Sequence, residues 1–339
     1  MSFPFNVYIL AFVLAGLATF LSMPLWRRWS HRIGLVDDPG HRKIHDQPVA
    51  LAGGLAVLTG LILPIFAGLI VSKAGLLGGP PGLAQGPRLP GLELSGWLSL
   101  GLSSRGSQLA VILLGALGMV VLGWLDDKYE LSARAKFGGQ FLIAAFVAVS
   151  GVRITLFVQS PAFSYAITIL WILTMTNALN FMDNMNGLCA GLGAISAWFF
   201  AWAAAAQGQY LVALIAFLTC GALVGFLPYN FPKASVFLGD AGSHLVGYLL
   251  GILAILPHFY SRENPNAWAV LKPLLILAVP LVDLVWVVLL RWRKGQPFYV
   301  GDTNHLSHRL VRRGWSKTGA VLMIWLLAAF AGAISFLRF

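Results

Sequence analysis

Four aspartates stand out in a strongly apolar chain, because each lies at the edge of a long hydrophobic run. Asp126 and Asp127 are adjacent at the end of one run, Asp183 lies in the stretch NALNFMDNMNG, and Asp240 opens another run in FLGDAGSHLVG. Neighbouring carboxylates beside an apolar span repel each other and lose hydration, so a divalent cation or a basic substrate group would stabilise them. Oxygen ligands without nearby cysteine favour Mg²⁺, which takes one or two carboxylates together with water and substrate phosphates.

Simpler interpretations stay open for the same residues. Asp126 and Asp127 also fit a solvated end of a span, and Asp240 also fits a helix cap, a role that aspartate fills well near an N-terminus. The asparagines around Asp183 are typical of a capping turn between two apolar runs.

A second polar group lies near the C-terminus, in the stretch GDTNHLSHRLVRRG. His305 and His308 are three residues apart, so on a helix they would share one face. With Arg309, Arg312 and Arg313 they form a cationic patch, although ordinary juxtamembrane charge also explains the arginines. A zinc site is disfavoured because no cysteine or HExxH motif supports it. Cations and magnesium-type carboxylates together predict phosphoryl transfer, with a lipid phosphate as one substrate.

The elements that must position these groups are membrane helices. The 339 residues are 58% hydrophobic and only 10% charged, whereas a soluble domain carries about 25% charged residues. The chain is therefore expected to be one all-α polytopic membrane domain, residues 1–339, with a Gly/Pro-rich loop at 74–107. Ten spans are expected, eleven at most: 5–26, 49–73, 108–125, 138–158, 163–179, 187–206, 209–227, 241–259, 267–290 and 318–337.

Charge sets the expected orientation. Most Lys and Arg residues fall on one set of loops, which the positive-inside rule makes cytoplasmic, with both termini outside. The net charge of +11 then reflects membrane topology, and no nucleic-acid partner is expected. Most acids share that cytoplasmic face, which the rule does not require. The polar residues gather in five cytoplasmic segments: 34–54, 123–140, 177–188, 228–243 and 291–317.

The five segments resemble, in order and spacing, the motifs of one family, the polyprenyl-phosphate N-acetylhexosamine-1-phosphate transferases, relatives of phospho-MurNAc-pentapeptide transferase. The family shows VDxPxxRKxHxxPxxxxGG, DD with a following Lys, NAxNxxDGxDGL, GDxGS and an HxxHR-like end. Here these are Val36–Gly54, Asp126-Asp127 with Lys136, Asn177–Leu188, Gly239–Ser243 and His305–Arg309. Each motif alone is weak, but five in register are specific.

The resemblance implies a reaction in which a polyprenyl (undecaprenyl) phosphate attacks the β-phosphorus of a UDP-N-acetylhexosamine. UMP leaves, and Mg²⁺, for which Mn²⁺ can substitute, is required. By motif position, Asp126, Asp127 and His305 are catalytic, and Asp240 and Asp127 bind the metal. The substrate-binding residues implied are Asp183, Asn180, Asn186, Lys136, Arg42, Lys43, His45, His308 and Arg309. The enzyme would lie in the bacterial cytoplasmic membrane with its active site in the cytoplasm, as a homodimer by family precedent.

The Arg42-Lys43-Ile44-His45 segment resembles the branch that uses UDP-GlcNAc and feeds O-antigen, teichoic-acid or exopolysaccharide assembly. Three departures from the family pattern concern Asn184, where a Gly is usual, Asn186, where an Asp is usual, and Ser307, where a His is common. Asn186 is expected to alter base or sugar preference. A transporter, a CDP-alcohol phosphotransferase and an inactive relative are the alternatives to the family enzyme.

Overall fold

A computed structural model describes residues 4–38, 48–73, 94–155, 158–257, 259 and 270–337. The expected substrate-binding residues Arg42, Lys43 and His45 lie outside these ranges, as does most of the Gly/Pro-rich loop.

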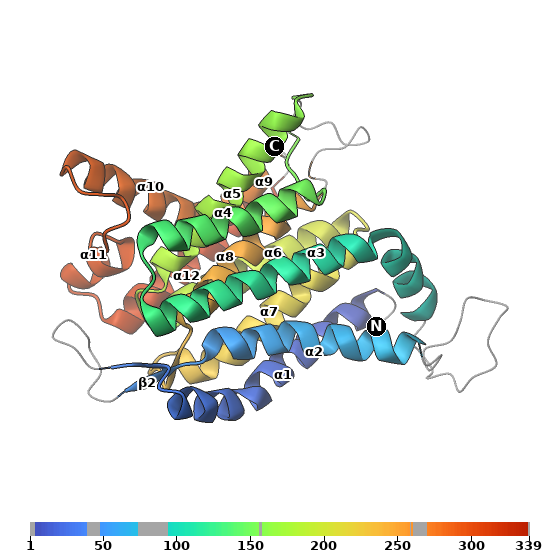
Figure 1. Ribbon diagram of the computed structural model, residues 1–339, viewed down its shortest axis with the longest axis horizontal. Coiled ribbons are helices and arrows are strands. Elements are labelled where there is room, and N and C mark those ends of the chain that lie inside the picture. The colour runs from blue at the N-terminus through green and yellow to red at the C-terminus, as the bar shows by residue number, and fades with distance from the viewer. Residues whose placement is uncertain are drawn as a thin grey trace.

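The described chain is a bundle of helices that run roughly side by side (Figure 1). They are α1 (Phe5–Arg32), α2 (Gly53–Lys73), α3 (Leu94–Tyr129), α4 (Ala133–Val149), α5 (Pro161–Met182), α6 (Leu188–Ala206), α7 (Tyr210–Asn230), α8 (Gly239–Ile255), α9 (Lys272–Ile276), α10 (Ala278–Arg293), α11 (Leu306–Arg312) and α12 (Lys317–Ile334). Seven of them are long and apolar enough to cross a membrane: α1, α2, α3, α5, α6, α7 and α12. The all-α, multi-pass architecture is thus confirmed, and the count of ten spans stays a prediction.

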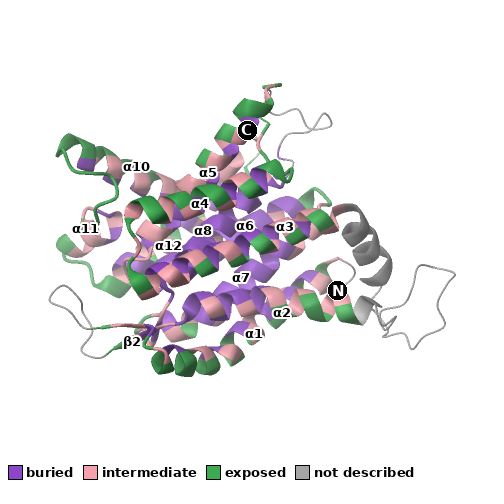
Figure 2. Ribbon diagram, viewed as in Figure 1, coloured by how far each residue is buried: buried purple, intermediate pink, exposed green. Residues whose placement is uncertain are grey.

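Helix α8 forms the centre of the bundle. Nearly all of its residues are buried, and it packs against α3 and α5 on two sides. Figure 2 shows the same buried centre, with exposed residues on the outer helices, and many of the exposed residues are large and apolar. An apolar outer surface is what a bilayer requires, because lipid tails solvate apolar side chains as well as a protein core does.

A three-stranded sheet at one end of the bundle was not expected. Strand β2 (Val49–Leu51) pairs antiparallel with β1 (Val36–Asp37) and parallel with β3 (Val236–Phe237). It joins two segments almost 200 positions apart in the sequence, and such short strands carry too few residues for a detectable period. The span predicted from residue 49 therefore begins at Gly53, after β2.

Two other expected boundaries were wrong. Residues 94–107 are the start of α3, not a loop. Helix α5 runs to Met182, so Asn177 and Asn180 are helical and only residues 183–187 form the turn. In α5 the helix continues through the asparagines because Asn177 bonds to Gln140 of α4 and Asn180 to Asp240 of α8, and these contacts outweigh local preference.

Candidate active site

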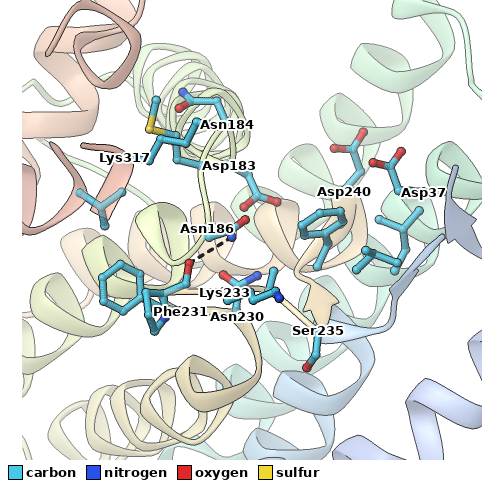
Figure 3. A pocket seen from close by; sticks show the side chains of 18 of the residues that line it. Asp37, Asp183, Asn184, Asn186, Asn230, Phe231, Lys233, Ser235, Asp240 and Lys317 are labelled. Carbon is cyan, nitrogen blue, oxygen red and sulfur yellow. Dashed lines mark hydrogen bonds between the residues drawn. The ribbon is translucent and has the colours of Figure 1, made fainter. Parts of the chain in front are cut away.

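A pocket of about 1030 Å³ opens at the end of the bundle that carries the sheet. Figure 3 shows it surrounded by side chains from separate parts of the chain, including Asp37, Asp183, Asn230, Lys233 and Asp240. Members of all five predicted polar segments are among the residues that line it. Helix α1 ends and α12 begins beside it, so both described ends of the chain lie away from the pocket.

Asp126, Lys136 and Asp240 form an ion-paired triad across α3, α4 and α8. The Lys136 ammonium lies 2.7 Å from a carboxylate oxygen of Asp126 and 2.7 Å from one of Asp240. Asn180 on α5 donates to the other Asp240 oxygen over 2.6 Å and to Ser243 Oγ over 2.9 Å. Four helices are thus cross-linked at one carboxylate, and Asp240 is held in a single orientation.

Asp127 caps helix α8 from outside. Its two carboxylate oxygens accept hydrogen bonds from the backbone N–H groups of Asp240 and Ala241, over 2.8 and 3.1 Å. The helix N-terminus favours this negative charge. The sequence suggested Asp240 as the cap of this helix, but Asp127 fills that role.

Two glycines allow the helices to come this close. A Cβ on Gly123 would lie 2.4 Å from backbone atoms of Asp240, and one on Gly239 would lie 2.7 Å from Asp127 Oδ2. Gly239 also has φ +72°, which other residues rarely adopt.

Asp183 differs from the other acids because it makes no side-chain hydrogen bond or ion pair with any residue that the structure describes. It lines the pocket directly after α5. Burial, together with the charges of Asp240 and Asp127, raises the pKa of Asp183 well above its usual value. An additional cation placed here would offset the excess negative charge.

The two histidines take different positions. His305 is buried, does not line the pocket, and its Nδ1 lies 2.6 Å from Asp283 Oδ2. The other Asp283 oxygen accepts the backbone N–H of Leu306 over 2.6 Å, which anchors the start of α11 to α10. His308 does line the pocket, and partial burial, with the nearby charges of His305 and Arg312, lowers its pKa. His308 is therefore the imidazole of this pair that faces the pocket.

Sequence reasoning missed the anchors behind α11. In the sequence, Asp283 is an acid inside the predicted span 267–290, and Arg291 belongs to the basic segment that follows it. Arg291 is fully buried, stacks on the ring of Phe181 at 4.8 Å, and pairs with Asp302 over 3.0 Å. Although partial burial opposes it, hydrogen bonds from Arg291 and Asn304 hold the pKa of Asp302 at about 2. The only sequence signal for these anchors was that a charged residue inside a span is costly and so needs a partner.

The cations at the pocket are not those that the motifs indicate. Arg309 stacks on Trp286 at 4.7 Å and does not line the pocket. Three other cations do line it, Arg27, Lys233 and Lys317, from three separate segments. Their sequence signal was only that of juxtamembrane positive charge.

A buried polar network supports the triad. Asn177 donates to Gln140 Oε1 over 2.7 Å, and Gln140 Nε2 lies 3.3 Å from His244 Nε2. Ligand atoms of Asp126, Asp240 and His244 lie within 4.8 Å of one another, a spacing that suits a metal ion. The Lys136 ammonium already supplies a cation between the two carboxylates.

Comparison with known proteins covers almost the whole chain. Residues 109–258 match the family described as Glycosyl transferase family 4. A Bacillus subtilis protein named as a probable undecaprenyl-phosphate N-acetylglucosaminyl 1-phosphate transferase is 30% identical over 327 residues, or 94% of this chain and 81% of that protein. The decaprenyl-phosphate N-acetylglucosaminephosphotransferase of Mycolicibacterium smegmatis is 31% identical over 359 residues, or 98% of this chain and 82% of its own length.

The chain belongs to the polyprenyl-phosphate N-acetylglucosamine-1-phosphate transferase family. An Escherichia coli K12 relative, named as an undecaprenyl-phosphate alpha-N-acetylglucosaminyl 1-phosphate transferase, is more distant, at 25% identity over 92% of this chain and 78% of its own length. The comparison confirms the family expected from the five motifs.

In this transferase, the donor set at the pocket suits Mg²⁺. Asp127, Asp183 and Asp240 line it together with the amide of Asn180, and no thiol among the described residues reaches it, because both cysteines are buried in α6 and α7. Carboxylate and amide oxygens are the ligands that Mg²⁺ prefers.

Proposed function

We propose that this transferase moves N-acetylglucosamine-1-phosphate from UDP-GlcNAc to a polyprenyl phosphate at the cytoplasmic face of the bacterial membrane. An oxygen of the lipid phosphate forms a bond to the β-phosphorus of the donor. The bond between that phosphorus and the bridging oxygen breaks, and UMP leaves with the electron pair. The products are polyprenyl-diphosphate-GlcNAc and UMP.

The observation that carries the proposal is the division of charge in the pocket. Asp127, Asp183 and Asp240 supply carboxylates, whereas Lys233 and Lys317 supply cations. A diphosphate chelated to a divalent cation carries both signs of charge, so it complements both sets of residues. Bound Mg²⁺ would neutralise charge on the transferred phosphoryl group.

Each chain residue has a proposed task. Asp240 and Asp183 would hold Mg²⁺, with Asp127 fixing the start of α8 so that Asp240 keeps its orientation. Lys136 pairs with both Asp126 and Asp240 and so offsets their mutual repulsion. Asp126 is proposed to accept a proton from a protonated lipid phosphate, and His308 to donate a hydrogen bond to a donor phosphate.

The test is UMP release by the purified protein with Mg²⁺, undecaprenyl phosphate and a panel of UDP-sugars, with the lipid product identified by mass. UDP-GlcNAc is expected to give the highest kcat/KM. EDTA should abolish release, and added Mg²⁺ or Mn²⁺ should restore it. Binding of the lipid without UMP release from any UDP-sugar would instead favour an inactive binding protein.

Sidedness needs a separate test. Cys189 and Cys220 are buried, so a single introduced thiol can report on one surface. Lys294→Cys lies in the exposed segment that follows α10, at the pocket end, and Gln207→Cys lies beyond the other end of α6. In intact cells, a membrane-impermeant maleimide should label Gln207→Cys and should reach Lys294→Cys only after permeabilisation. The reverse pattern would place the pocket outside.

A further inference from the structure

Two polar residues from separate segments, Asn184 and Ser307, are hydrogen-bonded to each other. Ser307, the second residue of α11, is fully buried, and its hydroxyl donates to Asn184 Oδ1 over 2.6 Å. Asn184 lies in the turn after α5, 123 positions away. Among the described residues, no other hydrogen bond joins this turn to α11.

Asn184 is held from both ends of its amide. While Oδ1 accepts from Ser307, Nδ2 donates to the backbone oxygen of Phe181 over 2.6 Å. Its backbone is not left-handed, since Glu130 is the one non-glycine residue with positive φ in the described chain. Tolerance of positive φ therefore does not explain this asparagine, whereas its two hydrogen bonds do.

The neighbours of the two bonded residues both line the pocket. Asp183 precedes Asn184, and His308 follows Ser307. Asp183 has no side-chain partner of its own among the described residues. The Asn184–Ser307 hydrogen bond is thus the direct link between the backbone that carries the unpaired acid and the backbone that carries the pocket imidazole.

We propose that Asn184 and Ser307 are positioning residues, whose hydrogen bond fixes the separation of Asp183 and His308 and so sets the affinity for the sugar-nucleotide donor. The proposal rests on the proposed function. A metal-bound diphosphate needs its carboxylate and its hydrogen-bond donor at a defined spacing, and displacements of about 1 Å are enough to impair such a site.

The experiment is a double-mutant cycle with Asn184→Ala, Ser307→Ala and the double variant. Each single variant should raise the KM for UDP-GlcNAc by about 3–10-fold and change kcat by less than about twofold, because donor positioning and not the reaction step is affected. The double variant should be no worse than the worse single variant, since both remove the same bond. Ser335→Ala removes a buried hydroxyl that bonds within α12 and should leave KM unchanged.

The same cycle is measured by thermal unfolding, which does not depend on activity. Non-additive Tm shifts are expected if the bond exists. Unchanged KM in both single variants, or effects on KM that multiply in the double variant, would overturn the proposal, as would additive Tm shifts. If the wild type released no UMP from any donor while the Tm shifts were non-additive, the proposed function would fail and the link between turn and helix would stand.

Discussion

The two walls of the pocket hold their polar groups in different ways. The carboxylate wall consists of Asp127 and Asp240, which line the pocket, with Asp126 and Lys136 paired behind them. The turn wall consists of Asp183, Asn184, Asn186 and His308, which line the pocket, with Ser307 bonded to Asn184 behind them. On the carboxylate wall every acid already has protein partners, two backbone N–H groups in one case and an ammonium in the others. On the turn wall the acid has none among the described residues.

The paired acids are held in a fixed orientation, whereas the unpaired acid is available to bind a ligand. Paired carboxylates keep one geometry without a ligand, and removing a partner leaves a desolvated charge. An unpaired, partly enclosed carboxylate costs stability until a cation arrives. We therefore expect changes on the carboxylate wall to lower stability and activity together, whereas removing the charge of Asp183 on the turn wall should lower activity without lowering stability.

The largest expected effect is that of Asp240→Asn, which removes the acid at which four helices are cross-linked. UMP release should fall by at least about 10³-fold, because a proposed metal ligand and the charge that pairs with Lys136 are both lost. The exposed acid Glu130 gives a matched control, since Glu130→Gln should retain full activity. Activity of Asp240→Asn within tenfold of wild type would remove it from the site.

Asp127→Asn should lose turnover and stability together. An amide has one oxygen where the carboxylate has two, so at most one of the two backbone N–H groups at the start of α8 keeps its acceptor. A loss of about 1–2 kcal/mol in the free energy of unfolding is expected from the cap. Equilibrium unfolding in detergent measures it, and an unchanged stability would contradict the capping role.

Asp183→Asn provides the sharpest contrast, because activity should fall by about 10²-fold while stability does not fall. The pKa of Asp183 is raised in the folded protein, so its charge opposes folding above the unfolded pKa of about 4. The variant should thus be slightly more stable than wild type at pH 7.5. The difference should vanish below about pH 4, where Asp183 of the wild type is protonated in both the folded and the unfolded state. Destabilisation at pH 7.5 would mean that Asp183 has a stabilising partner after all.

The smallest expected effect is that of Asn186→Asp, on the same turn. Asn186 Nδ2 donates to the backbone oxygen of Pro232 over 3.2 Å (Figure 3). An aspartate cannot donate and would add a second negative charge beside Asp183. The KM for UDP-GlcNAc should rise by about 2–5-fold, with a changed order of preference among UDP-sugars. An unchanged order would assign donor choice to another residue.

Much of the fold class and of the membership of the site could be predicted from the sequence, because hydropathy and motif order are local properties. The membrane class, the family and the gathering of Asp126, Asp127, Asp183 and Asp240 at one end of the bundle all follow from runs of residues read in order. The pairings could not be predicted. Asp127 caps a helix 112 positions away along the chain, and nothing near either residue indicates it.

The histidines show the same limit. The spacing of His305 and His308 predicted a shared helix face, but His305 precedes α11 and turns to Asp283, whereas His308 faces the pocket. Which imidazole is anchored depends on an acid on another helix, so no local pattern encodes it.

By itself, the sequence determined where the chain can meet lipid and which residue types gather at the pocket end, because burial in a bilayer and the cost of charge act residue by residue. Only the tertiary structure decided which acid is paired and which is open. That choice depends on how closely α3 and α8 approach, which Gly123 and Gly239 permit, and on the contact between Asn184 and Ser307.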